Sequence, residues 1–135
     1  MSILLLKSIL TTIVLVLAVI QALSMAQVRG YIKIMPIPPR TLRLVHRWGG
    51  DIALILALVV AVICLQTQYY AAYALHVPLH VAFGTLAILT MLIKFGIARR
   101  FRRRLRYALA LGITAGLSVL GVFSASALLY FMSRT

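Results

Sequence analysis

The stretch WGGDIALILALVVAVICLQTQ, residues 48–68, carries a single charged side chain, that of Asp51. A helix of about 20 apolar residues spans the hydrocarbon core of a bilayer and satisfies its own backbone hydrogen bonds where no water is available. This stretch therefore predicts a transmembrane helix.

Similar apolar segments occur on both sides of it, and the whole chain is 64% hydrophobic. We predict four transmembrane helices, over about residues 3–26, 48–68, 78–98 and 106–132. The connections are short, so the helices should form an antiparallel up-down bundle, and a chain of 135 residues leaves no room for a separate soluble domain. The predicted fold is an all-α integral membrane protein with one domain over residues 1–135.

The first apolar segment has a second interpretation, that of a cleaved signal peptide. Ser24, Met25 and Ala26 place small residues where a signal peptidase acts. Lys7, however, follows four apolar residues, which is an unusual start for a signal peptide. We therefore favour a membrane helix.

The basic residues are unevenly distributed. The chain has 14 Lys and Arg against one acidic residue, for a net charge of +13. Five of them lie between Arg29 and Arg47, six between Arg99 and Arg106, and none in residues 66–78. Short basic loops stay in the cytoplasm. Both termini are therefore predicted on the non-cytoplasmic side of a multi-pass protein, in a bacterial inner membrane.

The basic segment before the fourth helix predicts contact with anionic lipid headgroups. Its arginines are Arg99, Arg100, Arg102, Arg103, Arg104 and Arg106. Clustered arginines also bind nucleic-acid phosphates, but a position between two membrane helices favours the lipid bilayer, and we predict no nucleic-acid partner. In the other basic connection, Pro36, Pro38 and Pro39 predict an extended chain with no helix.

An antiparallel second and third helix place residues whose numbers sum to about 145 at one depth, within one helical turn. This rule brings Asp51 level with Lys94. An acid and a base at one depth inside the membrane are expected to pair, because an unpaired charge there is costly. We predict a structural ion pair between the two helices, with a role in a proton or quinone site as the alternative.

The same rule separates the histidines, with His46 near the cytoplasmic edge and His76 and His80 near the other. The three cannot bind one metal together. Gly50 follows His46 by four residues, and Gly84 follows His80 by four. Residues i and i+4 share a helix face, so each glycine leaves space for a flat macrocycle beside an imidazole.

The order HRWGG at residues 46–50, then HVAFG at residues 80–84 with a lysine fourteen positions after its histidine, resembles small four-helix membrane proteins of the cytochrome b and ferric-reductase-like type. The resemblance covers about residues 40–132. It implies a b-type haem held by histidines of adjacent helices, and electron transfer across or into the membrane. Carried over by position, the implied iron ligands are His46 and His80, with Gly50 and Gly84 beside them and Lys94 at the matching basic position.

One departure from that pattern concerns the opposing haem ligand. Related patterns often place another histidine about seventeen residues after the first, where this chain has Ile63 followed by Cys64. A haem would then need a single histidine, a contribution from His76, or a sulfur ligand such as Cys64 or Met132.

Two functions from different classes remain open. The first is a small electron-transfer subunit with haem b on His80, alone or together with His46, in the role that the resemblance implies, completed by a protein partner or a quinone. The second is an accessory or assembly subunit of a larger respiratory or photosynthetic membrane complex, either without a cofactor or with a chlorophyll-type pigment on the same histidines. It would dock on other membrane subunits through small-residue faces such as Gly112 and Gly116.

Other functions have less support in the sequence. No inverted repeat indicates a transporter. Asp51 is the only side-chain carboxylate, and no nucleophile with a base, zinc-ligand spacing or phosphate-binding loop is present. A non-catalytic subunit is therefore favoured over an independent enzyme.

Overall fold

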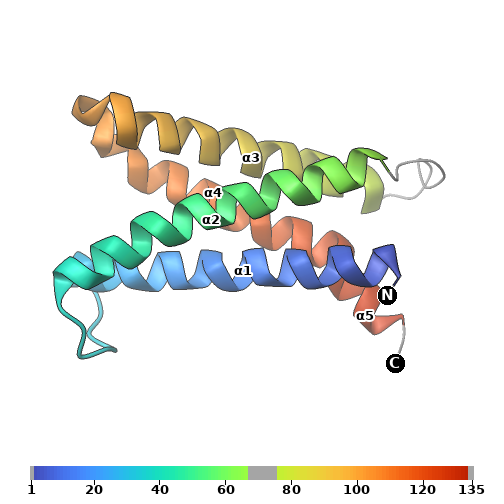
Figure 1. Ribbon diagram of the computed structural model, residues 1–135, viewed down its shortest axis with the longest axis horizontal. Helices are drawn as coiled ribbons and strands as arrows, with labels where there is room; N and C mark the ends of the chain where they lie inside the picture. The colour runs from blue at the N-terminus through green and yellow to red at the C-terminus, as the bar shows by residue number, and fades with distance from the viewer. Residues whose placement is uncertain (1, 67–75, 134–135) are drawn as a thin grey trace.

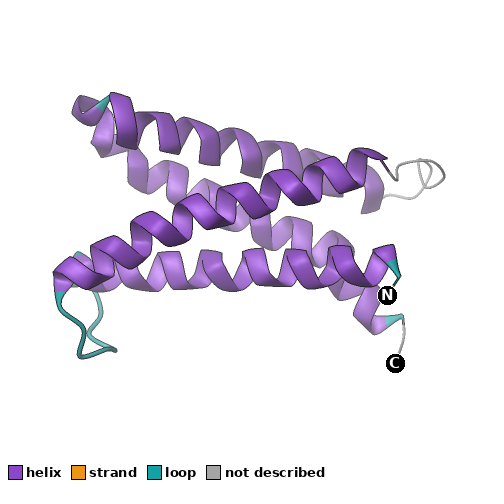
Figure 2. Cartoon of the chain, in the orientation of Figure 1, coloured by secondary structure: helices purple, strands orange, loops and turns teal. Residues whose placement is uncertain are grey.

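The computed structural model describes residues 2–66 and 76–133, except for the side chains of His76 and Arg102. It forms four long helical segments and, within the described residues, no strand (Figures 1 and 2). The elements are α1 (Ile3–Val28), α2 (Pro39–Gln66), α3 (His76–Arg100), and a last segment built from η1 (Arg102–Tyr107), α4 (Ala108–Phe123), η2 (Ser124–Leu128) and α5 (Leu129–Met132). Within these described ranges, four helices are long and apolar enough to cross a membrane. The prediction of an all-α, four-helix membrane fold is confirmed.

The helices run up and down in turn, so the start of α1, the end of α2, the start of α3 and α5 all lie at one end of the bundle (Figure 1). The connection after α1 and the basic segment before α4 lie at the other end. The placement of the first end on the non-cytoplasmic side stays a prediction from the distribution of charge.

Local side chains define the ends of α1. The hydroxyl of Ser2 caps the helix by accepting a hydrogen bond from the Leu5 backbone N–H at 3.3 Å. After the last turn, Gly30 has a φ of +80°, a conformation that glycine adopts at little cost. The Gln27 side chain then bonds to both backbone groups of Met35, at 2.5 and 3.0 Å, and so holds the connection against the end of the helix.

Helix α2 begins at Pro39, well before the predicted membrane span that starts at residue 48. The prediction of an extended connection was therefore wrong at Pro39, whereas residues 31–38 have no regular structure. Proline suits the first position of a helix because its φ is already helical and its missing N–H would have had no partner there. The extra turns carry exposed arginines and extend the helix beyond the apolar span.

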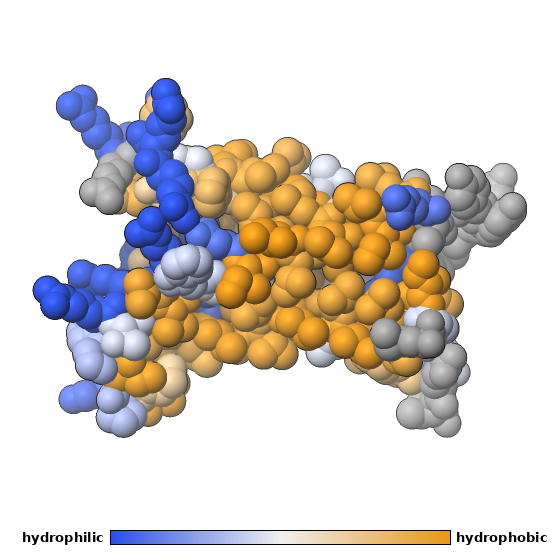
Figure 3. Space-filling view, viewed as in Figure 1, coloured by the Kyte–Doolittle hydropathy of each residue, from blue (hydrophilic) through white to orange (hydrophobic). Residues whose placement is uncertain are grey.

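The interior of the bundle is small. Val14, Ala87 and Val119 form its buried cluster, one each from α1, α3 and α4. Large apolar side chains are instead exposed along all four helices, and Figure 3 shows the apolar surface continuing along the bundle, with hydrophilic residues gathered mainly at the end with the basic connections. Lipid solvates such a surface, so close packing of small residues holds the helices together.

The helices pack as two hairpins. Helix α1 packs most extensively on α2, and α3 on α4, while α1 and α4 join the two hairpins. The contact between α2 and α3 is much smaller, and the two helices diverge toward the end with the basic connections (Figure 1). This loose contact positions the candidate site.

Candidate functional site

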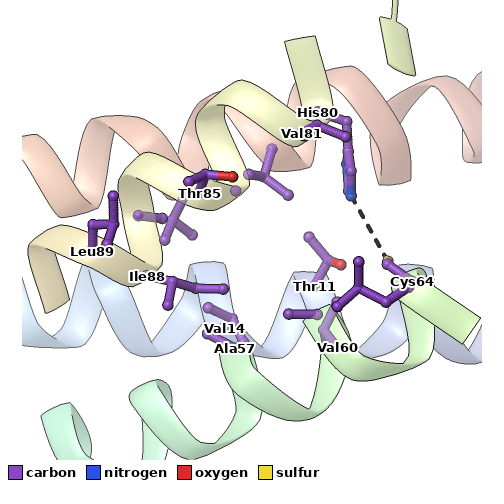
Figure 4. A pocket seen from close by; sticks show the side chains of 16 residues that line it. Thr11, Val14, Ala57, Val60, Cys64, His80, Val81, Thr85, Ile88 and Leu89 are labelled. Carbon is purple, nitrogen blue, oxygen red and sulfur yellow. Dashed lines mark hydrogen bonds between the residues drawn. The ribbon is translucent and has the colours of Figure 1, made fainter. Parts of the chain in front are cut away.

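An apolar cavity of about 300 Å³ lies between α2 and α3 (Figure 4). Its buried wall includes Val14 of α1 and Val119 of α4, while Leu65 of α2 and Leu89 of α3 are exposed at its edge. The cavity is therefore open toward the side of the bundle, where lipid would surround the protein. A volume of this size is at the lower end of small-molecule sites.

His80 and Cys64 meet at this cavity. The His80 Nε2 atom on α3 lies 3.8 Å from the Cys64 Sγ atom on α2, and Figure 4 shows the two side chains pointing toward each other. The rule that residue numbers at one depth sum to about 145 puts His80 level with residue 65, within one turn of Cys64, and the structure brings the two side chains together. An imidazole nitrogen and a sulfur are both good ligands for a transition metal or a haem iron.

The wall beside His80 has little side-chain bulk. Gly84, one turn after the histidine, lines the same cavity. A Cβ atom added there would lie 3.9 Å from a methyl group of Val122 on α4, which is ordinary van der Waals contact. Gly84 therefore lies on the same face of α3 as His80, as the spacing of four residues predicted.

His46 lies at the opposite end of α2, separated from Cys64 by eighteen residues, or roughly 27 Å of helix. Its Nδ1 atom is 3.1 Å from the backbone carbonyl oxygen of Gln21 on α1. That contact requires Nδ1 to be the donor, so in the neutral imidazole Nε2 keeps its lone pair. The structure does not bring His46 to the cavity, and the side chain of His76 lies outside the described residues.

The space beside Gly50 is used by a side chain of the protein. An added Cβ atom at Gly50 would lie 3.5 Å from the Gln21 side-chain oxygen, and one at Gly49 would collide with the amide nitrogen of the same side chain. The two glycines therefore make room for Gln21. The interpretation of Gly50 as space for a macrocycle was wrong, because Gln21 packs against that wall.

Asp51 pairs with Arg99, not with Lys94. The Arg99 Nη2 atom lies 2.6 Å from Asp51 Oδ2, and the guanidinium also lies over the Phe95 ring, 5.1 Å from its centroid. Arg99 follows Lys94 by five residues, toward the end where α2 and α3 diverge, and its longer side chain reaches across. The predicted Asp51–Lys94 pair was wrong because equal depth is defined only to about one turn.

Lys94 instead points into the bundle. Its Nζ atom would be 3.5 Å from a Cβ atom added at Gly112 of α4, and the lysine is within electrostatic range of the His46 imidazole on α2. The contact of Gln21 with Gly49 and Gly50 was not predicted from the sequence. An amide side chain inside an apolar segment, at the depth of two glycines on the next helix, could have indicated it.

Among the described residues, no group of three or more His, Cys, Asp or Glu side chains could hold a metal ion. The cavity therefore offers two converging ligand atoms, one nitrogen and one sulfur, in an apolar surrounding. Such a site suits a cofactor that brings most of its own metal ligands.

Comparisons with known proteins give one match. No curated protein and no solved structure matches the chain. One family model, described as a family of unknown function, matches residues 1–135. Since this match covers the whole sequence, the chain belongs to the DUF6529 family.

Proposed function

We propose that this protein is a small membrane electron-transfer subunit, resembling a b-type cytochrome, that binds haem b through His80 in a bacterial cytoplasmic membrane. The observation that carries the proposal is the meeting of the His80 imidazole and the Cys64 thiol at an apolar cavity between α2 and α3. Intramembrane ionisable groups are rare and are functional by default.

The donor atoms fit a metal-bearing cofactor. An imidazole nitrogen and a sulfur are both ligands that haem iron accepts from proteins. The Nε2–Sγ distance is 3.8 Å. The two atoms face each other from α3 and α2 at the apolar cavity, so these residues would hold such a group there.

Each part of the cavity has a role in this proposal. His80 would hold the cofactor from α3, and Cys64 would face it from α2. Gly84 keeps the adjacent wall free of side-chain bulk, while the apolar lining excludes water and so influences the reduction potential. The haem, when bound, supplies the one-electron chemistry.

An absorption spectrum tests the proposal. The full chain, purified from cells supplied with a haem precursor, should show haem bands that sharpen on reduction with dithionite. His80→Ala should lower the haem content per protein at least about tenfold. His46→Ala is the matched control, because this histidine lies outside the cavity and its loss should leave the haem content unchanged.

Three outcomes contradict parts of the proposal. A colourless wild-type protein would exclude the haem function. Equal haem content in the wild type and His80→Ala would show that the haem binds outside this cavity. Loss of haem in His46→Ala but not in His80→Ala would place it at the other end of α2.

A second candidate function is an accessory subunit of a larger membrane complex. The outer face of α2 favours it, since Ile55, Leu58, Val59, Val62 and Ile63 border a shallow apolar hollow there. A partner helix could occupy this hollow. A colourless protein that co-purifies in mild detergent with stoichiometric partners would support this candidate over the first.

A further inference from the structure

Gln21, His46 and Lys94 form a polar cluster at the end of the bundle with the basic connections. Among the described residues, Lys94 has no counter-charge. Lys94 lies on the face of α3 that it shares with His80 and Ala87, because these positions are seven residues, or about two turns, apart. Ala87 belongs to the buried core. The lysine is therefore directed inward, toward Gly112 of α4 and the imidazole of His46 on α2.

The described side chains offer Lys94 no free anion. Its 14 Lys and Arg face one acidic side chain, that of Asp51. Asp51 is already bound to Arg99 at 2.6 Å. Within the described ranges, 2–66 and 76–133, the Lys94 ammonium has no ion pair. A charge left unpaired inside a membrane protein is costly, so an anion supplied by another molecule would stabilise the Lys94 ammonium.

The surroundings of Lys94 strengthen the attraction for an anion. The His46 imidazole on α2 lies in electrostatic range of Lys94. The Gln21 side-chain oxygen is buried without a hydrogen-bond partner in the described part of the chain, so it can accept a hydrogen bond from a protonated ligand oxygen. The cluster thus offers an anion a cation, that of Lys94, and a free acceptor, the Gln21 side-chain oxygen.

The location selects the chemistry of the anion. Lys94 precedes Arg99 by five residues, so it lies roughly 7.5 Å further along the helix from the basic end of α3. It is partly exposed, and α2 and α3 diverge at this end. We propose that Lys94 is the binding residue for a phosphate anion, supplied by the headgroup of an anionic phospholipid or by free phosphate. This proposal does not depend on haem at His80.

Thermal unfolding of the full chain in lipid nanodiscs tests this site. Phosphatidylglycerol should raise the unfolding midpoint of the wild type by roughly 3–6 °C relative to phosphatidylcholine. Lys94→Gln should lose most of that rise. In phosphatidylcholine alone the variant should be at least as stable as the wild type, because the substitution removes an uncompensated charge.

Two controls separate this site from general attraction to the basic surface. Arg43→Gln removes an exposed positive charge from the first turns of α2, outside the arginines predicted to contact lipid headgroups, and should keep the full response to phosphatidylglycerol. Inorganic phosphate added to phosphatidylcholine nanodiscs identifies the source: a rise in the wild-type midpoint that Lys94→Gln lacks assigns the site to free phosphate. Should Lys94→Gln respond to both anions as the wild type does, or should neither anion stabilise the wild type, the proposal is wrong. Lys94→Met repeats the comparison in case the glutamine variant does not fold.

Discussion

The Arg99 side chain links two helices that otherwise have little contact. Its guanidinium joins Asp51 on α2 to α3, and it lies over the ring of Phe95 one turn earlier. The Arg99 side chain is 43% exposed, so water and salt weaken the pair. The pair therefore contributes modestly to stability, while it ties together two helices that otherwise touch little.

A double-mutant cycle measures this pair. Asp51→Asn and Arg99→Gln should each lower the unfolding midpoint in detergent, with a coupling free energy of about 0.5–1 kcal/mol. The same cycle with Asp51→Asn and Lys94→Gln is the comparison, and its coupling should be smaller. A larger coupling free energy of Asp51 with Lys94 than with Arg99 would show that Asp51 pairs with Lys94, as the sequence predicted.

The candidate site was only partly predictable at this scale. Counting residues along two antiparallel helices placed Cys64 opposite His80, because depth follows directly from helical rise. The same counting failed for Asp51, since side-chain length and the divergence of the helices decide which base is reached. Gln21 escaped notice because its role depends on how α1 packs against the glycines of α2, which no single-helix pattern records.

At the scale of the element, the packing of α3 on α4 includes a close contact of a ring with a glycine. A Cβ atom added at Gly121 would lie 2.7 Å from Cγ of Phe83 on α3. Real Cβ atoms do not come so close, so the ring or the helix would have to move. Gly116, on the same helix, has nothing within 4 Å of the corresponding position.

These two glycines form a matched pair of substitutions. Gly121→Ala should lower the stability of the bundle by about 1–3 kcal/mol through overpacking. Gly116→Ala should be neutral or slightly stabilising, because alanine is the better helix former. Chemical denaturation in mixed micelles measures both, and equal effects would show that the ring does not limit the approach of the two helices.

The fourth membrane segment is less regular than its composition indicates. It begins with a 3₁₀ turn at Arg102–Tyr107 and contains a π-helical stretch at Ser124–Leu128. The Ser124 and Ser126 hydroxyls donate to the carbonyl oxygens four residues earlier, at 2.9 and 2.6 Å, and so compete with regular backbone bonds. Hydropathy predicted the span correctly, but it contains no information about such local changes of helix type.

At the scale of the whole molecule, charge and hydropathy act together. The apolar surface matches the bilayer, and the basic connections lie at one end of the bundle. The number and order of the helices were predictable because both follow from lengths of apolar sequence. The separation into two hairpins was not, since it depends on which small residues meet between helices.

Reporter fusions test the predicted orientation. Alkaline phosphatase fused after residue 135 should be active and green fluorescent protein at the same place should be dark, because the positive charges retain the other end in the cytoplasm. A fusion placed between α3 and α4 should give the reverse pattern. A bright fluorescent fusion at the C-terminus would show that the orientation is opposite to the predicted one, with the His80 cavity near the cytoplasmic side.

The two-hairpin packing has a consequence for biosynthesis. The α1–α2 hairpin leaves the ribosome before α3 and α4 do, and Cys64 then has no histidine opposite it. The cavity comes into existence only when the second hairpin docks on the first. A ligand that contacts both walls of the cavity can therefore bind only after the last helix has been inserted. Binding of that ligand would show that assembly is complete.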